Sequence, residues 1–106
     1  MIVVMTKFPI NQEYLETFEQ YALERFGEKG LKEQEGFIKM NLLKPENFPP
    51  NSRNNIFIIE TYWKDMESLK KYMESDAFRK AHENPPPREW FAGHPVVEVY
   101  TVIKEG

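Results

Sequence analysis

Histidine is the residue type here whose chemistry is most useful near neutral pH, and the chain has two, His82 and His94. An imidazole can bind a metal ion or take a proton from a substrate. His82 follows Phe78 by four residues in a helical pattern, so the two side chains share one helix face. His94 lies between a glycine and a proline, where we expect an exposed loop. His82 is therefore the main candidate; the alternative is a histidine that only stabilises the end of a helix.

Several kinds of chemistry are excluded by composition or by missing motifs. The 106 residues include no cysteine, which excludes disulfides, thiolate metal sites, iron–sulfur clusters and cysteine nucleophiles. No phosphate-binding loop, dinucleotide fingerprint, G-x-S-x-G, H-E-x-x-H or EF-hand pattern occurs. The net charge is −3 and no basic stripe is present, so we expect no nucleic-acid partner. The longest apolar run, Met1–Met5, is too short to span a membrane, and we predict a cytoplasmic protein.

The elements that must position His82 follow from periodicity. Four segments have the residue types and alternation of strands: residues 1–10, 37–44, 56–63 and 96–103. An amphipathic helix begins after the N-cap candidate Asn11 and ends near Gly27 or Gly30. A second helix is capped by Asp65, and Ser75 or Asp76 caps a short continuation. The order β-α-β-β-α-β predicts one α+β domain over residues 1–106, with a ferredoxin-like fold and an antiparallel sheet.

The predicted strands are apolar on both faces, which bears on assembly. In the third strand one face has Ile56, Ile58 and Tyr62, and the other has Phe57, Ile59, Thr61 and Trp63. In the last strand Val97, Val99 and Ile103 oppose Val96, Tyr100 and Val102. Helices can cover only one face, so we predict a homodimer that covers the other; a monomer with an apolar groove is the alternative. Trp90 and Phe91, in the irregular segment 84–95, are expected to form a lid or to dock on the partner subunit.

A family resemblance rests on the second half of the chain, ETYWKDMESLKKYMESDAFRKAHEN. A strand ends in Trp63 and is followed by the charged pair Lys64 and Asp65, and then by a helix. A Ser-Asp-x-Phe-Arg-x-x-His element follows over residues 75–82. The start of the chain, the Glu-Arg-Phe at residues 24–26 and the Gly-Phe at residues 36–37 have counterparts as well. The chain resembles the antibiotic biosynthesis monooxygenase family, in particular the branch related to haem-degrading (IsdG-like) monooxygenases.

The resemblance implies a dimeric α+β barrel with a pocket between the sheet and the helices of each subunit. Haem-degrading members use a first-strand Asn, a helical Trp and an iron-ligating His in this pocket. His82 matches the His, whereas Thr6 and Tyr72 stand at the positions of the Asn and the Trp. This sequence thus departs from the haem-degrading pattern at two of three positions, which leaves haem binding open and places haem degradation in question.

Alternatives stand beside each of the other candidate residues. Tyr72 could line the pocket or bond a substrate carbonyl, or it could be a boundary aromatic with its hydroxyl in water. Thr6 could donate a hydrogen bond to a ligand, or be an ordinary sheet residue. Arg25, beside Phe26 on the first helix, could meet a carboxylate of an acidic ligand, or be a solvated charge. Trp63 is interpreted as a core residue.

The resemblance implies a monooxygenase that acts on haem or on a polycyclic, quinol-like molecule. With haem, His82 would be the iron ligand and the haem would supply the oxygen chemistry. Without a cofactor, His82 would be the base that deprotonates an electron-rich substrate. One alternative is a dimeric module that binds or senses a small apolar molecule such as haem. The other is an assembly domain whose pocket is filled by its own side chains.

Overall fold

The computed structural model describes residues 1–26 and 30–106, and its centre is a four-stranded antiparallel sheet. The strands are β1 (Ile2–Pro9), β2 (Phe37–Leu43), β3 (Ile56–Trp63) and β4 (Val96–Thr101), in the order β2-β3-β1-β4. β1 is central and pairs with both β3 and β4, and β4 is an edge strand. The predicted α+β, ferredoxin-like fold is confirmed.

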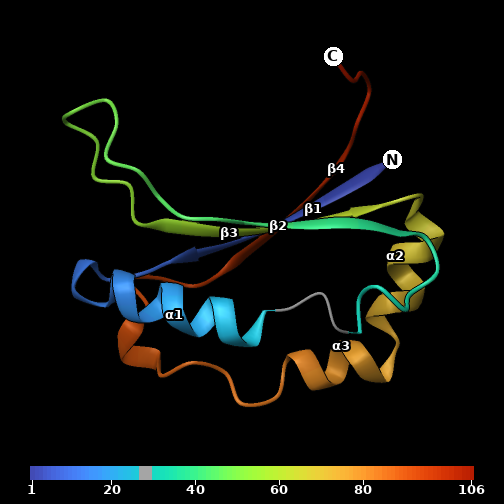
Figure 1. Cartoon of the computed structure of the whole chain (residues 1–106), viewed down its shortest axis with the longest axis horizontal. Coiled ribbons are helices and arrows are strands. Elements are labelled where there is room, and N and C mark those ends of the chain that lie inside the picture. Colours follow the sequence, from blue (N-terminus) through green and yellow to red (C-terminus); the bar gives the residue numbers. More distant parts are fainter. Residues whose placement is uncertain (27–29) are drawn as a thin grey trace.

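All helices of the described residues lie on one side of the sheet, as Figure 1 shows. They are α1 (Leu15–Arg25), α2 (Met66–Met73), α3 (Asp76–Ala81) and the short 3-10 helices η1 (Gln12–Tyr14) and η2 (Arg88–Trp90). The loop between β2 and β3 and the C-terminus project on the opposite side, which we call the open face. Among the described residues, no helix has the length and hydropathy needed to cross a membrane.

Helix starts in the second half of the chain follow the predicted caps. Asp65 precedes α2, and its Oδ1 accepts a bond from the backbone N–H of Ser68 at 2.9 Å. Ser75 precedes α3, and its Oγ accepts from the backbone N–H of Phe78 at 3.2 Å. Each acceptor satisfies one of the free N–H groups at a helix start. Gly36, with φ +83°, turns the chain into β2, where a Cβ would overlap Ser68.

The ends of α1 and β4 differ from the prediction. Asn11 is the N-cap residue of η1, but its side chain makes no capping hydrogen bond. Its Nδ2 donates to the carbonyls of Glu89 and Phe91 at 2.9 and 3.3 Å. α1 ends at Arg25, where the N–H of Phe26 still bonds the carbonyl of Ala22. Gly27, one of the two predicted helix ends, lies outside the described residues, and Gly30 lies in a later turn. β4 ends at Thr101, two residues before its predicted end.

Trp90 and Phe91 both pack within their own chain. Phe91 forms a bridge with Ile10, and its ring lies 6.3 Å from that of Phe18. The Trp90 ring lies 5.6 Å from that of Tyr21. The segment around η2 is therefore part of the core beneath β1, since the polar linker before it is long enough to return to α1. The lid and the contact with a partner subunit stay predictions.

The core on the helix side has two centres. One lies against α1 and is built on Ile10, Phe18, Ala22 and Phe57. The other lies against α2 and is built on Ile2, Leu31, Trp63 and Leu69. Trp63 is fully buried, as the sequence predicts. Val4 packs on the second centre and Phe8 on the first, so Thr6 of β1 lies between the two.

Candidate functional site

A stack of four rings leads from the second core centre to His82. The Trp63 ring lies 5.0 Å from that of Tyr72, and Tyr72 meets Phe78 edge-on at 5.4 Å. The Phe78 ring lies 4.1 Å from the imidazole of His82. The first three rings come from β3, α2 and α3, and His82 directly follows α3. We call these four residues the Trp63–His82 stack. The helical spacing predicted the last contact; the rest required the fold.

The backbone of α3 fixes the orientation of the His82 imidazole. His82 Nδ1 lies 2.8 Å from the carbonyl oxygen of Phe78. Because a carbonyl only accepts, this geometry assigns the proton to Nδ1 in the neutral ring. Nε2 then keeps its lone pair, and the side chain is exposed at the end of the helix. A lone pair held in this way can bind a metal ion or accept a proton from a substrate.

Tyr72 is half-buried and held by both its neighbours and its backbone. Ser75 Oγ donates to the Tyr72 carbonyl at 2.6 Å, while the ring stacks on Trp63. Burial raises the pKa of the Tyr72 hydroxyl. The phenol therefore stays protonated at neutral pH, where it can donate a hydrogen bond but cannot act as a base.

Thr6 occupies the middle of the helix-side face of the sheet. It pairs with Ile59 of β3 and with Val97 of β4. Its side chain is half-buried, and its hydroxyl makes no hydrogen bond to another described side chain. The structure thus leaves the Thr6 hydroxyl available to a ligand, whereas the Thr61 hydroxyl on the same face accepts a hydrogen bond from Trp63 Nε1 at 2.9 Å.

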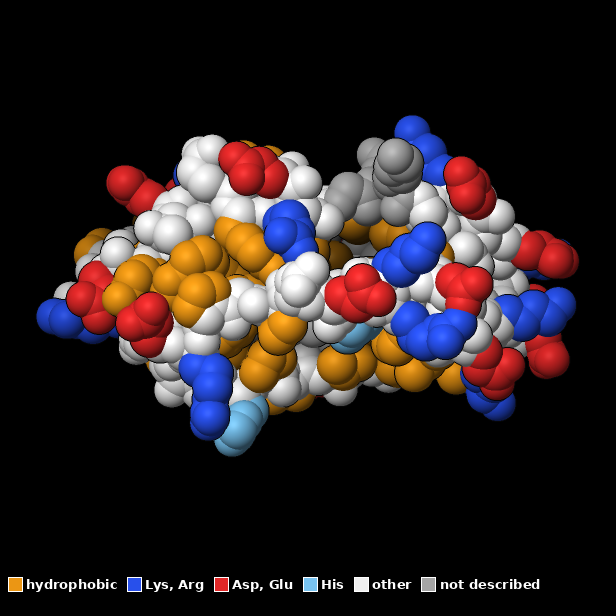
Figure 2. All heavy atoms as spheres, turned by 90° about the horizontal axis from the view of Figure 1, so that it is seen from below, with side chains coloured by type: hydrophobic (Ala, Val, Ile, Leu, Met, Phe, Trp, Pro, Cys, Tyr) orange, Lys and Arg blue, Asp and Glu red, His pale blue; other side chains and the backbone are white. Residues whose placement is uncertain are grey.

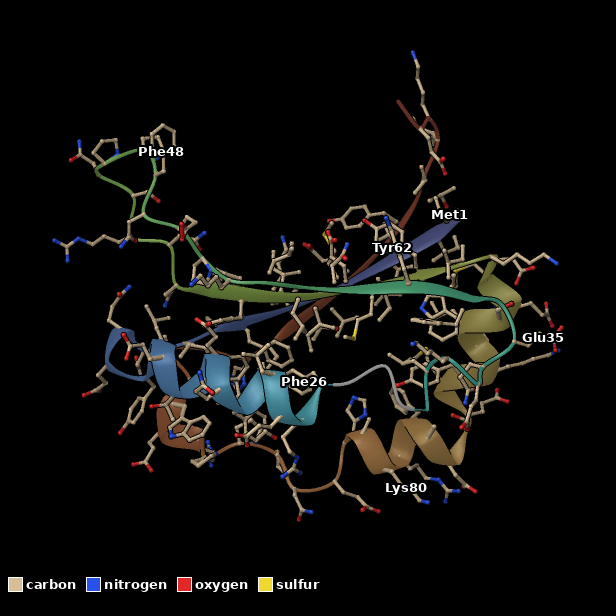
Figure 3. All side chains as sticks on the ribbon, viewed as in Figure 1. Met1, Phe26, Glu35, Phe48, Tyr62 and Lys80 are labelled. Carbon is tan, nitrogen blue, oxygen red and sulfur yellow. The ribbon has the colours of Figure 1, made fainter. Side chains whose placement is uncertain are left out.

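Arg25 and Phe26, at the end of α1, have different surroundings. Phe26 stacks on Phe8 with ring centroids 5.8 Å apart and belongs to the edge of the first core centre. Figure 3 shows it at the C-terminal end of α1 on the helix side of the sheet, whereas Lys80 points away from the sheet. The Arg25 guanidinium is exposed, 5.4 Å from the centre of the Tyr21 ring. Arg25 can thus reach solvent or an acidic ligand, and Phe26 offers an apolar wall.

Two residues that sequence reasoning did not place in a site are Val97 and Val99. They oppose Thr6 and Val4 across the β1–β4 ladder, so they lie on the helix side of the sheet. Both are nevertheless exposed, because the two core centres contain no residue of β4. Figure 2, seen from the side of the helices, shows hydrophobic side chains at the surface between them. The alternation of β4 was visible in the sequence, but its place at the edge was not.

Two surface hollows of the described chain lie elsewhere. One is lined by Gln12, Asn47, Pro50, Asn51, Ser52 and Arg53, and the other by Asp76, Arg79, Lys80 and Glu83. Both are lined mainly by polar or charged side chains, which do not suit an apolar aromatic molecule. Within residues 1–26 and 30–106, no group of three His, Asp or Glu side chains could hold a metal ion.

Comparison with known proteins decides the family. The family model for antibiotic biosynthesis monooxygenase matches residues 1–84, which is most of the chain. The chain belongs to this monooxygenase family. The matched region contains Thr6, Arg25, Phe26, Tyr72 and His82, and ends before η2 and β4. No curated protein sequence matches this chain.

Several solved structures have the same fold as this chain, although their sequence identity to it is low. A conserved protein from Methanosarcina mazei Go1 is 20% identical, with 93% of this chain and 89% of that chain covered and a TM-score of 0.65. The haem degrader MhuD from Mycobacterium tuberculosis, solved with two haems in its active site, is 15% identical. That match covers 100% of this chain and 99% of MhuD, with a TM-score of 0.73. At these identities the likeness extends to the fold alone.

Proposed function

We propose that this chain is a monooxygenase that binds haem or another polycyclic aromatic molecule on the helix side of its sheet. The observation that carries the proposal is the exposed His82 imidazole, whose Nδ1 bond to the Phe78 carbonyl leaves Nε2 free. Family membership supports the reaction class. We further propose that residues 1–106 act as one domain, since β4 lies beyond the matched residues but pairs with β1. A cytoplasmic location remains a prediction.

The donor set fits haem. A porphyrin supplies four nitrogens itself, so one neutral imidazole nitrogen suffices to hold its iron, and His82 offers one. Arg25 makes no ion pair with another described side chain and could bind a carboxylate of the ligand. When bound, haem would supply the oxygen chemistry, and the protein would bind and orient it.

The chain's own residues have distinct roles in this proposal. His82 Nε2 would hold the iron of haem. With a cofactor-free substrate, His82 Nε2 would instead accept the proton that an electron-rich substrate loses before it reacts with oxygen. The Tyr72 ring forms an aromatic wall. Its hydroxyl is a neutral hydrogen-bond donor, and burial raises the pKa of that hydroxyl. The Thr6 hydroxyl can donate to a ligand oxygen, and Phe26 limits the site on the side of α1.

Two observations favour a second candidate, a dimeric module that binds or senses such a molecule without turning it over. Tyr72 is fixed between Trp63 and Phe78, so its ring contributes to packing as well as to the site. Thr6 has a short hydroxyl where haem-degrading relatives use an amide. Both departures weaken the case for oxygen chemistry while leaving a ligand-binding surface intact.

The open face supports a homodimer, which we include in the proposal. Leu43, Val96 and Tyr100 are exposed there, and Figure 3 shows Phe48 and Tyr62 on this side. Several charged side chains on this face have partners within the chain. Lys7 Nζ lies 2.8 Å from Glu98 Oε1, and the Glu60 carboxylate accepts hydrogen bonds from Asn41 and Tyr62. Lys39, also on this face, lies with its Nζ 4.6 Å from the centre of the Tyr62 ring. A largely apolar face of this kind can meet a copy of itself.

The test is a haemin titration of the wild type, of His82→Ala and of the matched control His94→Ala, followed by absorbance. His94 is the other exposed histidine of the chain. We expect a saturable Soret shift at one haemin per chain in the wild type and in His94→Ala, and its loss in His82→Ala. A shift that is unchanged in His82→Ala contradicts the assignment of His82.

Turnover separates the two candidates. After loading with haemin, ascorbate is added in air and the Soret band is followed. A band that decays supports a monooxygenase, whereas a stable band supports the binding module. Absence of any shift in the wild type contradicts haem as the ligand and leaves His82 as a base for a cofactor-free substrate.

A further inference from the structure

The loop between β2 and β3 and the start of η1 border the larger of the two surface hollows, which we call the loop hollow. It has a volume of about 520 Å³, and its lining is Gln12, Asn47, Pro50, Asn51, Ser52 and Arg53. Figure 1 shows the loop and η1 at the same end of the sheet, with α2 at the other end. No residue of the Trp63–His82 stack lines it. Its volume is in the range of small-molecule sites, so it has room for more than a single ion.

Hydrogen bonds fix the two walls of the loop hollow relative to each other. The N–H of Ile10 donates to the carbonyl of Asn55 at 2.9 Å, and Asn55 Nδ2 donates back to the Ile10 carbonyl at 2.9 Å. Ile10 is fully buried, so this pair is anchored in the core. Gln12 follows Ile10 by two residues and Arg53 precedes Asn55 by two, so both walls start from the anchored pair.

The side-chain amides at this end of the molecule fall into two groups. Asn55 holds the backbone as just described, and Asn54 Oδ1 accepts from the N–H of Ile56 at 3.0 Å. Three amides line the hollow and make no hydrogen bond with another described residue, namely those of Gln12, Asn47 and Asn51. The Ser52 hydroxyl, also in the lining, is free in the same sense. Amides and hydroxyls both donate and accept, so this lining suits the hydroxyl groups of a ligand.

Arg53 supplies the charge of the loop hollow. It makes no ion pair with another described side chain, and the lining includes no Asp or Glu. Glu13 and Glu46, which adjoin lining residues in the chain, are exposed and do not line the hollow. A guanidinium binds a carboxylate or a phosphate through two parallel N–H bonds. The lining therefore combines one site for an oxyanion with several for hydroxyls.

The second hollow contains an arginine too, but its charges cancel. It is lined by Asp76, Arg79, Lys80 and Glu83, and Arg79 forms an ion pair with Asp76. An oxyanion placed there would meet two carboxylates as well as two cations. The difference between the hollows thus lies in the acids, and Arg79 is a natural control for Arg53.

We propose that the loop hollow binds a small polyhydroxylated molecule that carries one oxyanion group, such as a sugar phosphate or a sugar acid. Arg53 binds the oxyanion, and the amides and the Ser52 hydroxyl bond the hydroxyl groups. This site is separate from the proposed aromatic site at His82, and neither depends on the other.

The test is a calorimetric titration of the wild type, Arg53→Gln, Asn51→Asp and the control Arg79→Gln. The four probes are glucose 6-phosphate, glucuronate, glucose and inorganic phosphate. Each substituted side chain is exposed, so the variants should fold, and circular dichroism checks this. We expect one anionic sugar to bind at one per chain, and Arg53→Gln and Asn51→Asp to weaken it about tenfold or more, since a charged hydrogen bond is lost or a like charge is added. Arg79→Gln should leave the affinity unchanged.

Nuclear magnetic resonance locates the bound probe. The side-chain amide signals of Gln12, Asn47 and Asn51 should shift with the anionic sugar, while glucose and inorganic phosphate should bind about tenfold more weakly, since each lacks half of the contacts. The tighter of glucose 6-phosphate and glucuronate identifies the oxyanion as phosphate or carboxylate.

Four results would overturn the proposal. They are no binding of either anionic sugar at millimolar concentration, inorganic phosphate binding as tightly as both, an affinity that Arg53→Gln leaves unchanged, and an equal loss in Arg79→Gln. None of these results bears on the haemin titration of His82→Ala.

Discussion

Two groups of aromatic rings lie beneath the same sheet, and they are built differently. In the group against α1, the fully buried Phe18 ring meets rings from β1, β3 and the segment after η2, at 5.5, 4.9 and 6.3 Å. In the Trp63–His82 stack each ring meets the next one in line, and burial falls from the fully buried Trp63 to the exposed His82. The first arrangement closes a core, whereas the second connects a core to a surface.

The difference shows how similar residue types can serve stability or function. A ring surrounded on all sides stabilises the fold through apolar burial and edge contacts, and it does not orient any particular surface residue. In a line of rings, each ring orients the next. The buried indole of Trp63 packs on Tyr72, Tyr72 packs on Phe78, and Phe78 orients the imidazole of His82 through both its ring and its backbone carbonyl. We therefore expect damage to the α1 group to cost stability, and damage to the stack to cost the geometry of His82.

The largest expected effect is on the stability of the α1 group. Phe18→Ala should lower the free energy of unfolding by about 3–5 kcal/mol, because it removes a fully buried ring and leaves a cavity. Urea denaturation followed by circular dichroism measures this loss. Since the loss approaches the whole stability of a small domain, Phe18→Leu serves as a milder variant that keeps the protein folded.

The matched variant in the stack is Phe78→Ala, and the Phe78 ring that it removes is only half-buried. It should cost less than half as much stability as Phe18→Ala, and should shift the His82 tautomer away from the Nδ1–H form, as nitrogen-15 NMR reports. Equal stability losses, or an unchanged tautomer in Phe78→Ala, would contradict the distinction between the two groups.

The sequence predicts the fold well, and predicts less of what surrounds the site. Strand alternation, the Asp65 and Ser75 caps and the four-residue spacing of Phe78 and His82 are local signals, and the structure agrees with them. The partners of Asn11, Trp90 and Phe91 join residues about 80 positions apart, so no local pattern could show them. The exposure of Val97 and Val99 depends on strand order and helix placement, which are also global properties.

A smaller effect is expected from Ser75→Ala, which acts on the stack through its backbone. The Ser75 hydroxyl accepts from the Phe78 N–H and donates to the Tyr72 carbonyl, so its loss frees both ends of the joint between α2 and α3. We expect a loss of about 1 kcal/mol in unfolding free energy, typical of an N-cap serine, with a partial shift of the His82 tautomer. Ser52→Ala, in the loop between β2 and β3, is the control and should change neither. If Ser75→Ala loses the full amount of about 1 kcal/mol of unfolding free energy but the His82 tautomer does not change, the Ser75 hydrogen bonds are not needed to orient His82.

The smallest expected effect is the acid dependence of the Asp65 cap, at the start of the helix that carries Tyr72. The Ser68 N–H and hydroxyl both bond the Asp65 carboxylate, and these bonds lower the pKa of Asp65 below its usual value of 3.8. A lowered pKa in the folded state means that the cap stabilises the protein fully above pH 3.8, and that this contribution is lost as pH falls through the folded pKa. Asp65→Asn keeps an acceptor oxygen but does not titrate. We therefore expect the stability difference between wild type and Asp65→Asn to be largest near pH 6 and to shrink below pH 4, in denaturant titrations at a series of pH values. A difference that is constant between pH 2 and pH 6 would mean that the carboxylate charge contributes nothing to this cap.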